Sequence, residues 1–215
     1  MSKKDVAVVD YGIGNLLSVK RGLEYCGADV IVTSDKKNIL KASRVVLPGV
    51  GAFADGMKGL KKAELHEVVC EVASRGKPLM GICLGMQMLL DESEEFGLSK
   101  GLGLIPGKVI PIPKLDINNH THKIPHIGWS ELTVPQHKKE WNSDLMSYTR
   151  PGESVYFVHS FMAQVFHKEH EIANCSYGGI SISAVIGVNN IYGCQFHPEK
   201  SGEVGLKMLK SFVNL

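Results

Sequence analysis

Apolar and β-branched residues in the first half of the chain alternate between continuous runs and helical spacing. The continuous runs predict strands at residues 5–10, 28–33, 44–47 and 78–83, of which the first and the last are expected to be buried. Apolar residues three or four positions apart predict helices over residues 16–26, around Leu65, Val68, Val69 and Val72, and over residues 84–92. Because strand and helix alternate, we predict a parallel sheet covered by helices.

The pattern changes after Gly101, where proline and glycine separate shorter runs. These lie at residues 108–112, 154–161, 171–177, 182–188 and 191–196 and predict antiparallel hairpins. Asn189-Asn190 is a suitable turn, Ser201 is the predicted N-cap of a closing helix, and residues 114–123 are predicted to be a surface loop. We therefore predict one domain over residues 1–215. Its expected architecture is a three-layer α/β fold with a mixed, mainly parallel central sheet, flanking helices and an added antiparallel sheet.

Composition and charge exclude several classes of function. The 215 residues are 44% hydrophobic and 21% charged, as in ordinary globular proteins. A formal charge of +2 without a basic block gives no support to nucleic-acid binding. No apolar run approaches the roughly 20 residues of a membrane span. Five cysteines without a C-x-x-C pair, and the lack of a secretory signal pattern, favour reduced thiols and a cytoplasmic location.

Residues 81–85 (GICLG) lie where a predicted buried strand runs into a predicted helix. The two glycines permit a sharp turn that exposes Cys83, and the helix N-terminus favours a thiolate there. A buried structural cysteine is an equal alternative for this motif taken alone. His197-Pro198-Glu199 changes that balance, because it follows a strand that can reach the same sheet edge. We therefore predict Cys83 as nucleophile, His197 as its base and Glu199 as the group that orients the base.

A nucleophilic cysteine also needs donors for the oxyanion that forms on its substrate. The amide of Leu84, and that of Val50 or Gly51 at the end of the third predicted strand, are the predicted donors. A plain glycine turn at residues 48–51 is the alternative. Phosphate binding fits less well, because residues 12–15 (GIGN) lack a third glycine and residues 49–59 lack a Gly-Lys-Ser/Thr end.

Histidines gather in one polar stretch of the sequence, at His120, His122, His126 and His137. An H-x-H pair on a loop can hold zinc, but no nearby cysteine or suitably spaced carboxylate completes a ligand set. We therefore predict that the chain uses no metal and no cofactor.

Several motifs together resemble a known family. Residues 81–87 (GICLGMQ) and 195–199 (QFHPE) closely resemble the class I (triad) glutamine amidotransferases. The motifs DYGIGNL, PGVGAF, PHIGW and YFVHSF, which start at residues 10, 48, 125 and 156, narrow the resemblance to glutaminase subunits of imidazole glycerol phosphate synthases. The resemblance implies that Cys83 attacks the side-chain amide of L-glutamine, that His197 protonates the departing ammonia, and that Glu199 orients His197.

The same resemblance implies roles for further residues. Glutamine would be bound by Gly51, Gln87, Glu95, Ser160 and Phe161, and the loop at Val50 would rearrange when a partner is active. The ammonia would pass to a (β/α)8-barrel cyclase subunit of a heterodimer, which makes imidazole glycerol phosphate and an aminoimidazole carboxamide ribotide in histidine biosynthesis. The residues expected at that interface or along the ammonia passage are Asn15, His126, Trp129, Tyr156 and Lys200. Ordinary packing of Trp129 and Tyr156, and a solvated Lys200, are the alternatives.

Three other functions stay open at this point. Relatives of such subunits supply ammonia to enzymes that modify surface-polysaccharide sugars, and three departures from the family pattern suit that reading. Ser130 stands where asparagine is usual, Phe161 stands where tyrosine is common, and residues 114–123 match no family pattern. A non-catalytic interaction subunit is a second alternative, although the motif residues are intact. A cysteine hydrolase for another amide or ester is the third.

Overall fold

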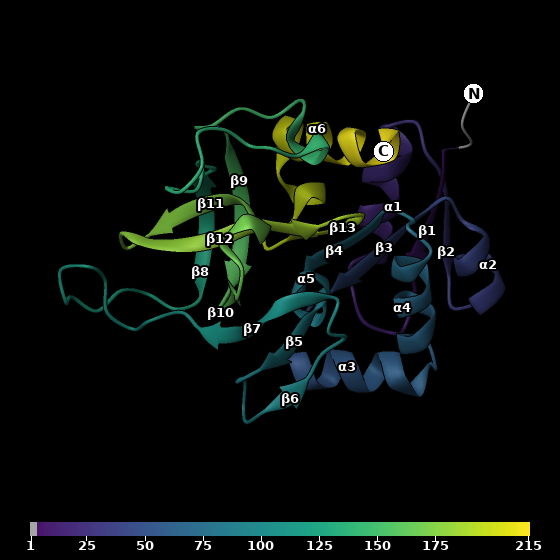
Figure 1. The fold of residues 1–215 in the computed structure, drawn as a ribbon, viewed down its shortest axis with the longest axis horizontal. Coiled ribbons are helices and arrows are strands. Elements are labelled where there is room, and N and C mark those ends of the chain that lie inside the picture. The colour runs from purple at the N-terminus through teal and green to yellow at the C-terminus, as the bar shows by residue number, and fades with distance from the viewer. Residues whose placement is uncertain (1–3) are drawn as a thin grey trace.

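The computed structural model describes residues 4–215. A seven-stranded sheet crosses the molecule in the order β11-β12-β13-β4-β3-β1-β2 (Figure 1). Its strands are β1 (Asp5–Val9), β2 (Asp29–Thr33), β3 (Arg44–Gly49), β4 (Leu79–Cys83), β11 (Glu171–Tyr177), β12 (Ile180–Val188) and β13 (Ile191–Cys194). The pairs from β2 to β13 are parallel, whereas β11, β12 and β13 pair antiparallel.

Alternate residues of the central strands point to opposite faces of this sheet. Different helices cover the two faces (Figure 1). Val6 and Val8 of β1 pack into one core with helices α1 (Leu16–Tyr25) and α6 (Gly202–Asn214). Ala7 and Val9 face a second core that also contains apolar residues of α2, α3 and α4. The bounds of these helices are α2 (Lys36–Lys41), α3 (Phe53–Lys62) and α4 (His66–Ser74). The result is the expected three-layer arrangement.

Two smaller sheets and a short helix complete the molecule. Four strands form a sheet in the order β10-β7-β5-β6, and β8 pairs antiparallel with β9. The bounds are α5 (Leu84–Met88), β5 (Leu90–Ser93), β6 (Ser99–Lys100), β7 (Ile105–Pro111), β8 (His126–Glu131), β9 (Ser154–His159) and β10 (Phe161–Val165). Three-residue 3₁₀ helices lie at Asp144–Met146, Lys168–His170 and Pro198–Lys200. No helix within residues 4–215 is both long and apolar enough to span a membrane.

The predicted α/β fold is confirmed, but two of the predicted elements were wrong. The helix expected over residues 84–92 ends at Met88, and the chain continues as strand β5. Residues 84–90 are buried without a polar face, so their spacing could not separate a helix from a strand. The strand expected over residues 154–161 breaks at Ser160, because β9 pairs with β8 while β10 pairs with β7.

The pattern also missed several elements, namely α2, α3, β5, β6 and β8. The turn at Asn189-Asn190 is confirmed: Asn189 has φ +52° and joins β12 to β13. Ser201 does precede α6, but it makes no side-chain capping bond. Its hydroxyl instead donates to the His197 carbonyl at 2.6 Å and accepts from the Tyr156 amide at 2.9 Å. The predicted N-cap residue therefore holds the segment around His197.

Candidate active site

Cys83 lies at the junction of β4 and α5, in a strained backbone conformation with φ +54° and ψ −110°. The flanking glycines allow the chain to pass very close to itself. A Cβ at Gly85 would lie 1.8 Å from the Leu47 carbonyl oxygen, and one at Gly81 would lie 2.6 Å from the Gly85 backbone. Cys83 is 8% exposed at the carboxyl end of a central parallel strand. The sharp turn predicted from residues 81–85 is therefore present.

His197 and Glu199 form a buried ion pair beside this strand. The Nδ1 atom of His197 lies 2.8 Å from Glu199 Oε1, and the two side chains are 3% and 1% exposed. Strand β13 ends at Cys194 and pairs parallel with β4, so His197 follows the strand next to Cys83. The second carboxylate oxygen of Glu199 is buried without a hydrogen-bond partner among residues 4–215. One oxygen of Glu199 is thus committed to orienting the imidazole.

Burial by itself lowers the pKa of His197, because it disfavours the charged imidazolium. Hydrogen bonds with Cys83 and Glu199, together with their negative charges, outweigh burial and raise the pKa of His197 to about 9. A protonated His197 at neutral pH can stabilise a thiolate at Cys83 and can donate a proton to a departing amine. This site can therefore perform acyl transfer through a cysteine.

Gln195 is a member of the site to which sequence reasoning assigned no role. Its Nε2 atom donates to the Cys83 sulfur at 3.9 Å, and its Oε1 accepts from Gln87 Nε2 at 3.1 Å. A signal for this placement was present, since Gln195 stands in the same QFHPE motif as His197, two positions before it. Gln195 links the thiol to the side chain predicted to bind substrate.

The loop of residues 48–51 lies beside Cys83, as expected for oxyanion donors. Strand pairing places Gly49 opposite Cys83, and the Leu84 amide begins α5 where no earlier turn supplies an acceptor. Tyr11 fixes the start of this loop, because its buried hydroxyl donates to the Pro48 carbonyl at 2.8 Å. Burial, with the charge of Cys83, raises the pKa of Tyr11. Sequence analysis had not singled out Tyr11.

One pocket of about 380 Å³ joins most of the residues predicted for the site. From that set its lining includes Val50, Gly51, Cys83, Leu84, Gln87, Glu95, Ser160, Phe161 and His197. Phe96, Pro125, Val158 and His159 also line it, without having been predicted. Glu95 has a second task, since its carboxylate accepts from the Phe53 amide at 2.6 Å at the start of α3. Nine residues from five separate stretches of sequence thus share one cavity.

The residues expected at a partner surface occupy different environments. Trp129 on β8 is 58% exposed and packs edge-to-face against Tyr156 of β9, with ring centroids 6.0 Å apart. Lys200 is exposed, and Asn15 is half-buried at the start of α1. His126, by contrast, is only 1% exposed and makes hydrogen bonds inside the chain, so it lies off the exposed surface, and its place along an ammonia passage stays a prediction.

The clustered histidines do not meet as a ligand set. His122 lies against the Pro113 carbonyl at 2.6 Å, and His126 is bonded to His159 and Ser130. Within residues 4–215, no three His, Cys, Asp or Glu side chains gather as a metal site.

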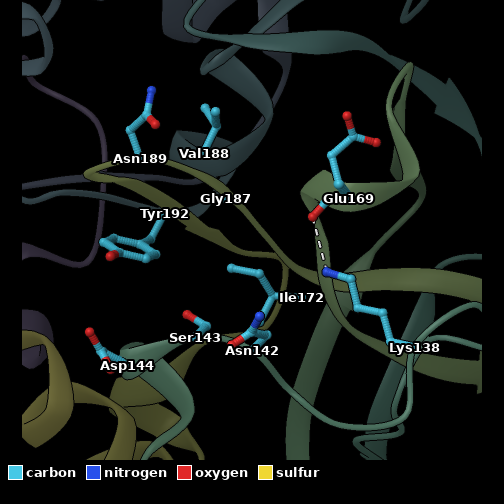
Figure 2. A pocket seen from close by; sticks show the side chains of 10 residues that line it. All are labelled: Lys138, Asn142, Ser143, Asp144, Glu169, Ile172, Gly187, Val188, Asn189 and Tyr192. Atoms are coloured by element: carbon cyan, nitrogen blue, oxygen red, sulfur yellow. Dashed lines mark hydrogen bonds between the residues drawn. The ribbon is translucent and has the colours of Figure 1, made fainter.

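A second pocket, of about 280 Å³, lies at the β12–β13 turn and shares no lining residue with the first. Figure 2 shows Lys138 reaching the backbone carbonyl of Glu169, which accepts from its ammonium at 2.9 Å. Lys138 also donates to the Glu171 carbonyl. Its charge is thus engaged by backbone oxygens, and none of the residues predicted for catalysis or binding lines this pocket.

Comparison with known proteins connects this geometry to a family. The family model for glutamine amidotransferase class-I matches residues 7–215. The chain belongs to the class I glutamine amidotransferases. Two relatives are named imidazole glycerol phosphate synthase subunit HisH 1 and imidazole glycerol phosphate synthase subunit HisH. The relative from Legionella pneumophila strain Lens is 50% identical, and the match covers 98% of this chain and 99% of the relative. The relative from Geobacillus sp. strain WCH70 is 43% identical, and the match covers 98% of this chain and 96% of the relative.

Solved structures agree on the fold of this family. A crystal structure titled glutamine amidotransferase has a TM-score of 0.72 at 15% identity, covering 98% of this chain and 99% of that one. The structure of PurLQS from Thermotoga maritima has a TM-score of 0.70 at 21% identity, covering 99% and 98%. The expected class I glutamine amidotransferase fold is therefore confirmed, and the chain is a glutamine amidotransferase.

Proposed function

We propose that this chain is the glutaminase subunit of an imidazole glycerol phosphate synthase in histidine biosynthesis. The observation that carries the proposal is the near-complete coverage of two relatives with that name at 50% and 43% identity, joined to the Cys83 pocket. The substrate in this proposal is L-glutamine, bound by Gly51, Gln87, Glu95, Ser160 and Phe161.

The proposed reaction has two steps, both centred on Cys83. The thiolate attacks the side-chain amide carbon, and the amides of Leu84 and of Val50 or Gly51 stabilise the oxyanion. The C–N bond then breaks, and the departing ammonia takes its proton from His197. In the second step His197 removes a proton from water, which attacks the thioester and releases glutamate with the thiolate restored. Glu199 orients the imidazole throughout.

Ammonia must leave the site before it is protonated in solution, because ammonium is not a nucleophile. In the proposed complex it passes to a (β/α)8-barrel cyclase subunit, which makes imidazole glycerol phosphate and an aminoimidazole carboxamide ribotide. The exposed Trp129, with Tyr156 beside it, and the exposed Lys200 are the proposed contacts, together with Asn15. A cytoplasmic location follows from such a biosynthetic role.

The test measures glutamate release from glutamine by the purified chain, alone and with a barrel cyclase plus its ribonucleotide ligand. The Cys83→Ala variant is the blank, and we expect it to release no glutamate while keeping the far-ultraviolet circular dichroism of the parent chain. Strong stimulation by the cyclase supports the proposal. If a glutamine-like electrophile labels Cys83 but the cyclase gives no stimulation, the acceptor is a different enzyme and the proposal fails.

A further inference from the structure

A buried chain of hydrogen bonds runs from β8 to the wall of the Cys83 pocket. Ser130 Oγ lies 2.9 Å from His126 Nε2, His126 Nδ1 lies 3.0 Å from His159 Nε2, and His159 Nδ1 lies 2.8 Å from the Phe161 carbonyl oxygen. His126 is 1% exposed and His159 is 6% exposed. His159 and Phe161 line the pocket, whereas His126 and Ser130 lie behind it.

Aromatic packing holds the His126 ring in this chain. Tyr177 stacks on it with centroids 4.1 Å apart and an interplanar angle of 24°. Phe157 stacks on it at 4.8 Å and 20°. Tyr177 is anchored in turn, because its hydroxyl donates to the Lys123 carbonyl at 2.6 Å. Because Tyr177 and Phe157 both stack on the His126 ring, the ring cannot rotate freely, and its two nitrogens keep His159 and Ser130 as their partners.

The protons in this chain have one consistent arrangement when both imidazoles are neutral. A carbonyl oxygen only accepts, so His159 must carry its proton on Nδ1 and donate to Phe161. Its Nε2 is then an acceptor, and His126 must donate from Nδ1. His126 Nε2 is therefore also an acceptor, which the Ser130 hydroxyl satisfies. Each link fixes the direction of the next.

Both imidazoles are neutral at physiological pH. Burial, assisted by the charge of His122, lowers the pKa of His126 to about 4. Burial also lowers the pKa of His159 to about 4, with the bond to Phe161 opposing this and the charges of His126 and His197 assisting it. The proton arrangement above is thus the one expected during catalysis.

The end of this chain is part of the pocket wall. The Phe161 carbonyl accepts from His159 and also from Gln87 Nε2, at 3.2 Å. This carbonyl stands where the chain leaves β9 and enters β10, beside Ser160. If His159 took its other tautomer, its Nδ1 lone pair would face the carbonyl oxygen and repel it. The pocket wall would then lose the buried hydrogen bond from His159 to the Phe161 carbonyl, and the carbonyl would move.

We propose that His126 is a positioning residue for substrate binding: its Nδ1–H holds His159 in the tautomer that keeps the Phe161 carbonyl in place. The inference rests on the proposed function, because it takes glutamine as the ligand of this pocket. His126 itself does not touch that ligand. Its effect is on the affinity for glutamine rather than on the reactivity of Cys83.

The test compares two substitutions at one position. His126→Asn keeps an N–H donor near the Nδ1 position, whereas His126→Leu fills the space without a donor. His122→Leu is the matched control, since His122 also stacks on Tyr177, with centroids 4.9 Å apart, but has no bond to His159. If His126→Leu does not fold, Ser130→Ala removes the far end of the chain with less change in volume.

Two reagents separate binding from thiol reactivity. A diazomethyl-ketone analogue of L-glutamine must bind the pocket before it alkylates Cys83, whereas iodoacetamide reports the thiol alone, and mass spectrometry localises each label. We expect His126→Leu to raise the half-saturating concentration of the diazoketone about tenfold, the loss expected for one hydrogen bond. The iodoacetamide rate should stay unchanged. His126→Asn and His122→Leu should remain within about twofold of the parent chain.

A nitrogen NMR measurement gives an answer that does not depend on activity. In ¹⁵N-histidine-labelled protein, His159 should be protonated at Nδ1 in the parent chain and in His126→Asn, and mixed in His126→Leu. Equal shifts of the diazoketone constant in the Asn and Leu variants, or no shift in either, would overturn the proposal. If iodoacetamide labels the parent Cys83 but the diazoketone does not, the proposed function fails. The ¹⁵N shifts then decide the tautomer separately.

Discussion

Replacing Gly85 by alanine tests whether the turn at Cys83 depends on close contact between α5 and β3. A Cβ at Gly85 would lie 1.8 Å from the Leu47 carbonyl oxygen and 2.8 Å from the Leu47 carbonyl carbon. Carbon and carbonyl oxygen ordinarily approach to about 3.3 Å even in close contacts. Both atoms belong to backbone, so rotating a side chain cannot relieve the overlap. The helix and the strand must separate by about 1.5 Å, the difference between these distances.

That separation has a cost in stability and a cost in function. Inserting one carbon into a packed core typically costs about 1–3 kcal/mol, and an overlap with rigid backbone belongs at the upper end. For a protein of this size, about 3 kcal/mol lowers the unfolding midpoint by roughly 6–12 °C. Cys83 and Leu84 move with α5, and a displacement of about 1 Å in a catalytic group can slow a reaction about a hundredfold.

The assay is thermal unfolding of Gly85→Ala, followed by circular dichroism, together with the rate of Cys83 labelling by the diazoketone. Gly59→Ala on α3 is the control, because its Cβ would come no closer than 3.2 Å, to a Tyr11 ring carbon. Alanine there also gains about 1 kcal/mol of helix propensity. If Gly85→Ala unfolds at the parent temperature and is labelled at the parent rate, the turn does not require glycine and the reasoning is wrong.

Two further predictions concern the ionised groups of the site. Glu199→Gln keeps the shape but removes one of the two negative charges, with that of Cys83, that raise the pKa of His197. Glutamate release should fall by up to about 10⁴-fold, as in a Ser-His-Asp triad that loses its carboxylate, and an unchanged pH–rate profile would contradict this role. The free energy of unfolding should be greatest near pH 6.5, which is about the pKa of histidine in the unfolded chain. The stability contributed by protonated His197 is lost as the pH rises through about 9. The stability contributed by neutral His126 and His159 is lost as the pH falls from 6.5 toward about 4. Urea unfolding across this range checks both slopes, and equal stability at pH 5 and pH 7 would contradict the neutral histidines.

The parallel half of the fold could be predicted because local pattern and tertiary structure agree there. The predicted apolar runs became β1 to β4, of which β1, β3 and β4 are buried and β2 lies at the sheet edge, and the glycines around Cys83 marked the turn at a strand end. The second half was harder to predict, because β9 pairs with β8 whereas β10, which follows it directly, pairs with β7 in another sheet. Residue pattern says which face of a strand is apolar, but it does not say which sheet the strand joins.

The candidate site was predictable where chemistry is carried by motifs and not where it is carried by packing. Cys83, His197 and Glu199 stand in short motifs; Cys83 and His197 line one pocket, and Glu199 pairs with His197. Gln195, Tyr11 and His159 act through contacts between elements distant in sequence, so spacing along the chain could not assign their partners. His126 is the opposite case: it stands in a family motif, but the motif did not reveal that its side chain is buried.

The features that local rules could not supply are concentrated around Cys83, and each is unfavourable taken alone. Cys83 has a positive φ that residues other than glycine rarely adopt, and Glu199 buries a carboxylate oxygen that has no hydrogen-bond partner among the described residues. His126 and His159 are kept neutral by burial, at a cost that grows in acid. These costs persist because the two cores on either side of the sheet hold β3, β4 and β13 in register. The strands, rather than the contacts of the site itself, therefore fix the geometry that places a thiol beside an imidazolium.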